Sequence, residues 1–404
     1  MKKIIKKQPV WVWISLCFFL IVIGYFIIPE ISARNYIKAN EKIQKTENIK
    51  EITPEVLPVV KTEEENIIVT HKETPKPLKA VYMSSWAASS DTFRKKITDL
   101  IDKTELNAVV IDIKDYTGKI AFNVSNPDLQ KFGSTENRIR NIKSLIEELH
   151  KKNIYVIGRI AVFQDPFFIK ARPDLAVKTL SNKNAIWKDR KGMTWIDAGS
   201  REFWDYTILI AKESYSIGFD ELNFDYIRFP SDGNMKDIYF PISNGKIKKE
   251  VMKEFFKYLN EKLVNTDSPR TGMKISGDVF GMVATNNDDL NIGQMLEDTI
   301  EYFDYVAPMV YPSHFPNGWN GFKNPANNPY DVIKISMDKA VARTKTAGKD
   351  PNKIRPWLQD FNMGATYTKE MVRAQIKATY DAGLDSWMLW DPGNTYTEGA
   401  LLSN

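Results

Sequence analysis

Cysteine and histidine are scarce in this chain, and each scarcity narrows the chemistry available to it. Cys17 is the single cysteine among 404 residues, so no disulfide can form within one chain. Large domains do not need such cross-links, so this observation does not identify a compartment. The three histidines are His71, His150 and His314. A catalytic zinc usually takes two or three histidines. We therefore expect no metal site and no other cofactor.

Two common motifs and a strongly basic surface are also missing. No G-x-S-x-G segment occurs, which disfavours an ordinary serine hydrolase. The first apolar segment after residue 79 leads into "SSWAASSD" instead of a glycine-rich loop, which disfavours a dinucleotide-binding sheet. The net charge of +5 is mild, and lysines near the amino end carry much of it. Nucleic-acid binding requires a concentrated basic face and is not expected.

The amino-terminal part divides by composition into three segments. Residues 10–28 are apolar and uncharged, and as a helix they would span about 30 Å, the thickness of a bilayer core. Lysines precede this run, which predicts a single-pass anchor in the cell membrane, with residues 1–9 cytoplasmic and the rest extracytoplasmic. A cleaved signal peptide is the alternative. Residues 29–78 are rich in Lys, Glu, Thr and Pro, which predicts a disordered linker.

From residue 79 onward, short β-rich segments alternate with helical patterns. Most gaps carry apolar residues at helical spacing, and two helical patterns end in Gly218 and Gly383 directly before a β-rich segment. This alternation predicts a (β/α)8 barrel over residues 79–404, with an open doubly wound sheet as the alternative. Thirteen residues follow Asp391, so the eighth helix must be short or missing. The predicted strands lie within residues 80–86, 107–115, 154–163, 219–229, 274–281, 304–311, 355–361 and 385–391.

Polar residues gather where the predicted strands end. In "GFDELNFDYIRFP", residues 218–230, Leu222 and Phe224 share one strand face, while Asn223 and Asp225 share the other. In a barrel we expect the apolar pair to face the helices and the polar pair to face inward, near the end that carries active sites. The residues that we expect to contact a substrate are Asp112, Lys114, Arg159, Asn223, Arg228, Tyr311, His314, Gln359, Asp360, Trp390 and Asp391.

Asp225 and Asp278 are the predicted catalytic pair, because they lie at the ends of consecutive strands. Carboxyl groups are about 5–5.5 Å apart in retaining glycosidases and about 6.5–9.5 Å apart in inverting ones. Structural alternatives remain open for each. Asp225 could pair with Arg228 or Arg159, and Asp278 could bind a neighbouring loop. Asp360 and Asp391 are weaker substitutes, and Asp112 and Lys114 could neutralise each other.

Aromatic residues are frequent in the same predicted loops. The apolar faces of sugar rings lie on aromatic planes, so this clustering favours a carbohydrate cleft. A well-packed loop layer is the alternative for each single residue. The residues concerned are Trp86, Tyr116, Phe163, Trp187, Trp195, Tyr226, Phe229, Tyr311, Phe315, Trp319 and Trp390.

Several motifs in order resemble a bacterial family of glycoside hydrolases that is distantly similar to α-amylase-type barrels. They include "VVIDIKDYTGKI", "GRIAVFQDP", "GFDELNFDYIRFPSDG", "SGDVFG", "PMVYPSHF" and "RPWLQDF", and the resemblance covers residues 79–392. It implies a (β/α)8 barrel and hydrolase activity. In amylase-type barrels the nucleophile ends strand four and the acid ends strand five. Asp225 and Asp278 match by position, although glutamate is usual at strand five.

A second resemblance lacks the catalytic residue of its motif. "GFDELNFDY" resembles the D-x-x-D-x-D-x-E motif of chitinase-type barrels, with Asp220 and Asp225 at the first and last aspartates. Asn223 replaces the middle aspartate, and Ile227 stands in place of the catalytic glutamate. The chitinase mechanism is therefore not transferred to this chain.

The leading hypothesis is a membrane-anchored glycoside hydrolase that cleaves a cell-envelope or extracellular polysaccharide with two carboxylates. A non-catalytic carbohydrate-binding barrel is one alternative, favoured by the missing strand-five glutamate. The other alternative is a metal-dependent polysaccharide hydrolase or deacetylase that uses Asp112, Asp225 and His314.

Overall fold

The structure, a computed structural model, describes residues 67–264 and 273–404. The predicted cytoplasmic stub, the membrane anchor at residues 10–28 and most of the predicted linker lie outside these residues. Within the two described ranges, no helix has the length and hydropathy needed to cross a membrane.

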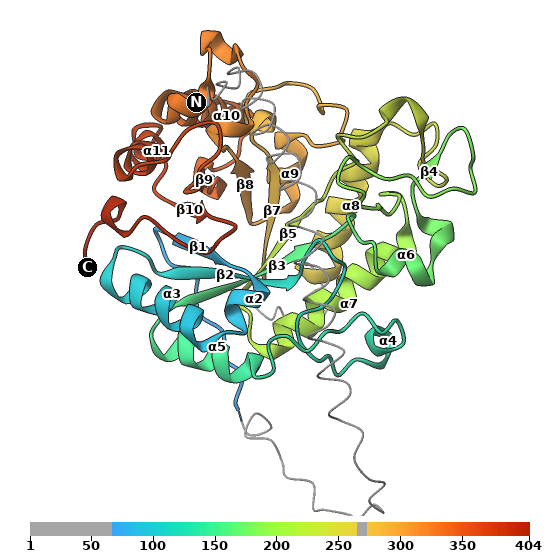
Figure 1. Cartoon of the computed structure of the whole chain (residues 1–404), viewed down its shortest axis with the longest axis horizontal. Helices are drawn as coiled ribbons and strands as arrows, with labels where there is room; N and C mark the ends of the chain where they lie inside the picture. Colours follow the sequence, from blue (N-terminus) through green and yellow to red (C-terminus); the bar gives the residue numbers. More distant parts are fainter. Residues whose placement is uncertain (1–66, 265–272) are drawn as a thin grey trace, which may run out of the picture. The chain divides into compact units, whose positions relative to one another are not determined.

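Eight parallel strands close into a barrel in the order β1-β10-β9-β8-β7-β5-β3-β2 (Figure 1). Each of the eight segments expected to form a strand overlaps one of them, so the predicted barrel is confirmed and the open sheet is excluded. Two short strands, β4 (Lys178–Thr179) and β6 (Ile238–Tyr239), form a separate antiparallel pair. The barrel strands are β1 (Lys79–Met83), β2 (Ala108–Lys114), β3 (Tyr155–Ala161), β5 (Glu221–Asp225), β7 (Lys274–Phe280), β8 (Tyr305–Met309), β9 (Trp357–Gln359) and β10 (Trp387–Trp390).

Helices surround the strands (Figure 1). Ser200 caps the amino end of the helix before β5 by accepting from Phe203 N, and Gly218 ends that helix at φ 125°, where glycine is favoured. No α-helix follows β10 in residues 391–404; a short 3₁₀-helix at Glu398–Ala400 stands there, as the length of the remaining chain predicts. The longer helices are α3 (Asp91–Lys103), α5 (Ile142–Lys151), α7 (Arg201–Ile217), α8 (Lys248–Leu263), α9 (Leu296–Tyr302), α10 (Pro329–Thr346) and α11 (Lys369–Asp381), and the short ones are α2 (Ser85–Ala88), α4 (Pro127–Gln130) and α6 (Phe168–Ala171).

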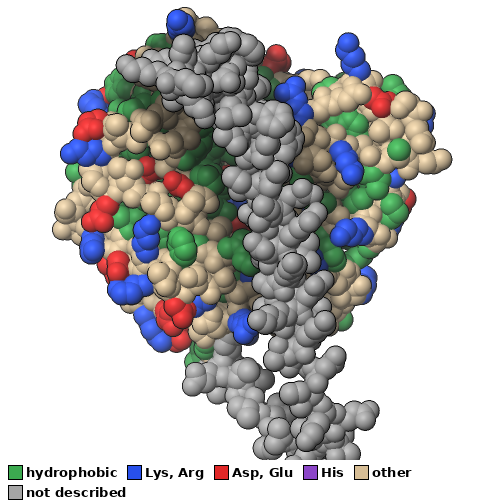
Figure 2. Space-filling model, viewed as in Figure 1, with side chains coloured by type: hydrophobic (Ala, Val, Ile, Leu, Met, Phe, Trp, Pro, Cys, Tyr) green, Lys and Arg blue, Asp and Glu red, His purple; other side chains and the backbone are tan. Residues whose placement is uncertain are grey.

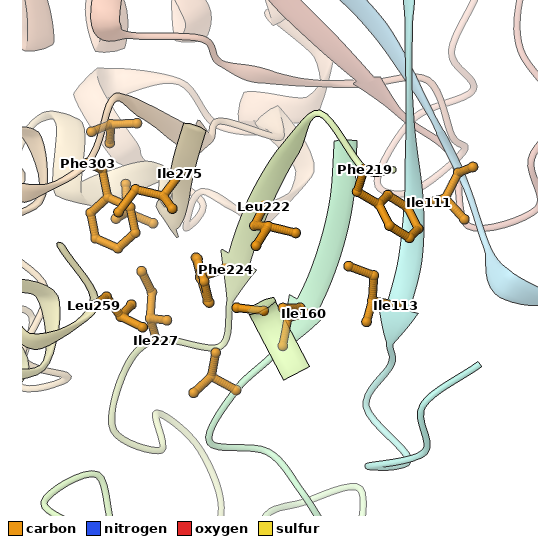
Figure 3. Packing of buried hydrophobic residues seen from close by; sticks show 14 of the residues in the cluster. Ile111, Ile113, Ile160, Phe219, Leu222, Phe224, Ile227, Leu259, Ile275 and Phe303 are labelled. Atoms are coloured by element: carbon orange, nitrogen blue, oxygen red, sulfur yellow. The ribbon is translucent and has the colours of Figure 1, made fainter. Parts of the chain in front are cut away.

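The main hydrophobic core lies between the strands and the helices. Leu222 and Phe224 of β5 are fully buried there, in one cluster with Ile160 and Phe303 (Figure 3). Their neighbours along β5 point to the opposite face and form hydrogen bonds inside the barrel. The alternation predicted for this strand is confirmed. Both faces are buried because helices cover the outside of a parallel barrel.

The folded unit begins earlier than the sequence predicts. Residues 67–78, assigned above to a disordered linker, contact the amino-terminal ends of the strands. The backbone N–H of Lys72 donates to Asp220 Oδ1 at 2.6 Å, and the hydroxyls of Thr74 and Tyr155 lie 3.0 Å apart. The boundary at residue 79 is therefore corrected. The composition of this segment predicts disorder, but hydrogen bonds to distant barrel residues hold it in place.

The coloured part of the face shown in Figure 2 carries positive and negative side chains intermixed with hydrophobic ones. Such mixing is usual for a globular surface. The groups that distinguish this protein are therefore better sought inside its cavities than on this outer face.

Candidate active site

A cavity of about 630 Å³ lies at the carboxyl ends of the barrel strands. Asp225, the last residue of β5, and Asp278, near the end of β7, both line it. Asp225 is 6% exposed and Asp278 is 1% exposed, so little of either residue reaches solvent. The two predicted catalytic carboxylates therefore line the same cavity.

Arg159 of β3 holds the acidic groups together. Its Nη1 donates to Asp112 Oδ1 at 2.6 Å, and its Nη2 donates to Asp225 Oδ2. Its Nε lies 4.0 Å from Asp278 Oδ2. The parallel register explains this proximity, because Arg159 pairs with Asp112 on one side and with the residue two before Asp225 on the other. One guanidinium thus faces three carboxyl groups and cannot neutralise all of them.

Among the three carboxyl groups that face Arg159, Asp278 is the most protected from water. Burial and, to a smaller extent, the negative charge of Asp225 together raise its pKa to about 8. Its Oδ1 accepts from Asn223 Nδ2 and from Trp357 Nε1, each at 2.9 Å. With both donors on Oδ1, the proton of the neutral acid belongs on Oδ2.

Asp225 has different surroundings. One oxygen accepts from Arg159 and the other from the backbone N–H of Tyr226 at 2.5 Å, and both donors stabilise a carboxylate. Tyr226 adopts φ 54°, a left-handed conformation that is rare for a bulky residue. Such backbone strain clusters at functional sites, and here it accompanies an N–H directed at a carboxylate.

Asp112 and its neighbours support Arg159 from below the cavity. The Tyr82 hydroxyl donates to Asp112 Oδ2 at 2.5 Å, and burial raises the pKa of Asp112. The ring of Tyr82 stacks on Trp390 with centroids 3.9 Å apart, and the guanidinium of Arg159 lies 5.1 Å from the Trp390 ring centroid. Asp112 therefore positions the arginine and does not line the cavity.

The structure separates the predicted site residues into two groups. Those that line the cavity are Arg159, Asp225, Arg228, Asp278, Tyr311, His314 and Trp390. Those outside the lining are Asp112, Lys114, Asn223, Gln359, Asp360 and Asp391.

Several residues of the second group bond within the protein. Lys114 is fully buried and binds Asp165 at 2.6 Å, so the open possibility of an Asp112–Lys114 pair is not realised. Gln359 and Asp360 hydrogen-bond to neighbouring loops. A substrate in the cavity would not contact these groups, because their polar atoms are turned to the protein.

The aromatic residues divide in a similar way. Tyr226, Tyr311, Phe315 and Trp390 line the central cavity, whereas Tyr116 and Trp195 line an adjoining one. The alternative of loop packing describes the buried residues outside these linings, which are Phe163, Trp187 and Phe229.

Sequence reasoning missed two contributors. Trp357 lies two residues before Gln359 in β9, so both side chains are on the same face of the strand. The predicted inward position of Gln359 therefore also predicts that Trp357 points into the barrel, where it binds Asp278. Lys191 lines the cavity from the long connection between β3 and α7. Long connections often carry function, and this length was the available signal for Lys191.

Two further cavities share lining residues with the central one. One of about 500 Å³ shares Lys191, Tyr226 and Arg228. Another of about 780 Å³ shares Phe315 and is rich in asparagine. The open space at this end of the barrel therefore extends beyond the two carboxyl groups in more than one direction along the loops.

The residues proposed for a metal-dependent mechanism do not assemble. Within residues 67–264 and 273–404, no group of three or more His, Cys, Asp or Glu is placed to hold a metal ion. Asp112 and Asp225 both bind Arg159, and His314 Nδ1 lies 3.0 Å from Ser313 Oγ. A guanidinium already occupies the place between the two carboxylates.

Comparisons with known proteins add to this geometry. No curated protein matches the chain. The PgaB (BpsB) glycoside hydrolase domain from Bordetella bronchiseptica is 13% identical, with a TM-score of 0.59, covering 81% of this chain and 99% of that one. At this identity the similarity supports the fold alone.

Two other solved structures have lower TM-scores against this chain. A hypothetical protein from Ruminiclostridium thermocellum is 37% identical, with a TM-score of 0.44 and coverage of 49% and 97%. The Bacillus cereus spore cortex-lytic enzyme SleL is 9% identical, with a TM-score of 0.46 and coverage of 80% and 73%.

A family described as "Putative glycosyl hydrolase domain" matches residues 80–396. That match spans most of the chain, which therefore belongs to this family of glycosyl hydrolases.

Proposed function

We propose that the barrel cleaves a glycosidic bond of a polysaccharide with Asp278 as general acid and Asp225 as the ionised partner. The observation that carries this proposal is the contrast between two carboxyl groups in one cavity. Arg159 and a backbone N–H stabilise Asp225 as a carboxylate, whereas burial raises the pKa of Asp278 to about 8. Glycosidases need one carboxyl group in each form.

Each group then has a defined role. Asp278 Oδ2 donates its proton to the leaving glycosidic oxygen, while Asn223 and Trp357 hold Oδ1. Asp225 attacks the sugar or removes a proton from an attacking water. Arg159 fixes the orientation of Asp225 and balances its charge. The anomeric form of the first product, read by NMR, distinguishes direct attack from activation of water.

A polymeric substrate is favoured over a single sugar. The central cavity shares lining residues with two others, so bound sugar units could continue past the point of cleavage. Aromatic side chains in these linings offer flat surfaces for sugar rings. Open, extended binding regions of this kind suit a chain that enters and leaves the site.

The test is hydrolysis by the full chain in detergent, measured as new reducing ends from a panel of polysaccharides. We expect Asp225→Asn and Asp278→Asn each to lower kcat by about 10²–10⁴-fold, the usual worth of a positioned acid or base. Asp288→Asn is the matched control, because Asp288 is exposed in the loop after β7 and lies outside the cavity lining. Full activity in either of the first two variants would show that the assignment is wrong.

The non-catalytic barrel remains the competing function. It predicts that polysaccharides bind to the full chain without release of new reducing ends, and that both aspartate substitutions leave this binding in place. The raised pKa of Asp278 argues against it, because a binding site gains nothing from a carboxyl group kept protonated beside a carboxylate.

We also propose that residues 10–28 anchor the chain in the cell membrane, with the barrel outside, facing a cell-envelope or extracellular polysaccharide. The uncharged run and the lysines before it support this arrangement. Protease added to intact cells that express the full chain should digest the barrel and leave a cytoplasmic marker untouched. A barrel protected until the cells are lysed would contradict the orientation.

A further inference from the structure

Arg228 is a buried cation without an ionic partner. It follows β5 in the loop, is 8% exposed, and makes no salt bridge with any residue that the structure describes. Its Nη1 donates to Phe229 O at 3.0 Å and to Ser231 Oγ at 3.2 Å. The rings of Trp195 and Phe280 lie 4.8 and 4.5 Å from its guanidinium carbon. Burying an unpaired charge is costly, so a function is expected for it.

One edge of this guanidinium is unused. Nε and Nη2 of Arg228 have no hydrogen-bond partner among the described residues, and neither belongs to the sealed polar atoms that lack one. Both nitrogens therefore keep accessible surface. Arg228 lines the central cavity and the adjoining cavity of about 500 Å³, so the residue that carries this edge borders both.

The same edge chelates carboxylates elsewhere in this protein. Two other arginines donate from Nε and Nη2 to the two oxygens of one carboxylate, at distances of 2.6–2.9 Å. The planar fork of arginine matches a carboxylate in this way. Arg228 has the same pair of donors without a partner among the described residues, and it lines a cavity. The two pairs are Arg172–Asp174 and Arg343–Glu297.

The charges around Arg228 are one further cation and three carboxylates, of which Asp225 is already bound by Arg159 and by the N–H of Tyr226. Lys191 is exposed and lines both cavities, which adds a second cation. Asp189 also lines the adjoining cavity, but its Oδ2 accepts from Trp195 Nε1 and its Oδ1 from two backbone N–H groups. Asp232 lines both cavities and is exposed to water, which weakens its effect.

We propose that the Nε–Nη2 edge of Arg228, assisted by Lys191, binds a carboxylate carried by a sugar unit of the substrate. The enzyme would then act on an acidic polysaccharide, one that contains uronic acid or another carboxyl-bearing sugar next to the cleaved bond. This inference rests on the proposed function, because it names the substrate class of the same site.

Binding to the full chain in detergent tests the proposal without requiring turnover. D-glucuronate and D-glucose are titrated separately, and the bound fraction is followed by saturation-transfer NMR. The two sugars differ at one carboxylate, so we expect glucuronate to bind about 10–100-fold more tightly, as charge-assisted hydrogen bonds allow. Equal affinities, or no glucuronate binding at tens of millimolar, would overturn the proposal. Acetate that binds as tightly as glucuronate would assign the site to free anions and overturn the sugar class.

Variants separate the fork from a general positive charge. Arg228→Gln should remove the preference for glucuronate, and Arg228→Lys should lose most of it because lysine lacks the planar fork. Arg190→Gln is the matched control, since Arg190 is exposed on the same loop as Lys191 but lines neither cavity. Preference retained in Arg228→Gln would overturn the assignment.

A second variant and the hydrolysis assay distinguish loss of the carboxylate site from loss of folding or of catalysis. Should Arg228→Gln unfold, Lys191→Gln decides instead, because this exposed substitution leaves the core intact and should weaken glucuronate binding severalfold. Unchanged affinity there would count against the site. A protein that prefers glucuronate but releases no reducing ends would contradict only the proposed hydrolysis. A protein that hydrolyses neutral and acidic glycans equally would contradict only the carboxylate site.

Discussion

Residues of one type acquire different chemistry in this cavity through their surroundings. Asp112, Asp225 and Asp278 all face Arg159, but the first two accept its hydrogen bonds while the third lies 4.0 Å from Nε. Burial is then decisive for Asp278, because the charge of Arg159 offsets only part of the loss of water around its charged form. The pair resembles other acid–base sites in which neighbouring carboxyl groups have different surroundings.

The raised pKa of Asp278 predicts a limit on the alkaline side of the activity profile. Asp278 must be protonated to act as an acid, and its raised pKa of about 8 means that this form persists at neutral pH and is lost as the pH rises through about 8. We expect kcat/KM to fall with an apparent pKa near that value, which belongs to the coupled pair. Reducing-end assays from pH 5 to 10 would measure it.

The Asp288→Asn protein should give the same profile as the parent chain. Constant kcat/KM up to pH 10 would contradict the role of Asp278 as the acid. A fall complete below pH 6 would contradict it as well, because the acid form would then be absent where burial should preserve it.

At the scale of elements, strand alternation and register bring the site together. Leu222 and Phe224 fix β5 against the helices, and this leaves Asn223 and Asp225 on the inner face. The ladder sets Asn223 beside Arg159 on one side and beside a serine of β7 on the other. A slip of one residue would turn Asp225 into the helix layer. The site therefore depends on the same packing that stabilises the barrel.

At the scale of the whole folded unit, the described segment before β1 and the active site lie at opposite ends of the strands. Residues 67–78 bind at the amino-terminal end through contacts such as Lys72 with Asp220 and Leu78 N with Ser386 Oγ. The candidate active site opens at the carboxyl end. Stability and catalysis should therefore respond separately to changes in this segment.

Removing residues 67–78 should destabilise the barrel without abolishing hydrolysis. A chain of residues 79–404 loses several hydrogen bonds, including one to a buried carboxylate, and we expect its free energy of unfolding to fall by about 1.5–3 kcal/mol. Urea denaturation of residues 67–404 and of residues 79–404 would measure the difference. Below the unfolding transition, kcat/KM should be similar for both.

Equal denaturation midpoints for the two chains would contradict a structural role of this segment. Loss of kcat/KM in a shortened chain that remains folded would show that the amino-terminal end of the barrel influences the active site.

The sequence by itself determined the eight strands, the inward direction of Asp225 and the missing last helix. These features depend on local alternation, helical spacing and chain length, which neighbouring residues encode. It also supported Asp225 and Asp278 as candidates, because both lie at ends of consecutive strands that had to meet in a barrel.

Only the tertiary structure decided which partners these groups take. Lys114 binds Asp165, and residues 67–78 dock on the barrel, so both contacts join residues far apart in the chain. The unused edge of Arg228 likewise depends on which residues the fold brings near it. Such pairings depend on distances and burial that no local pattern records. The charge state of Asp278 follows the same rule, because it is set by removal from water and by the nearby charge of Asp225.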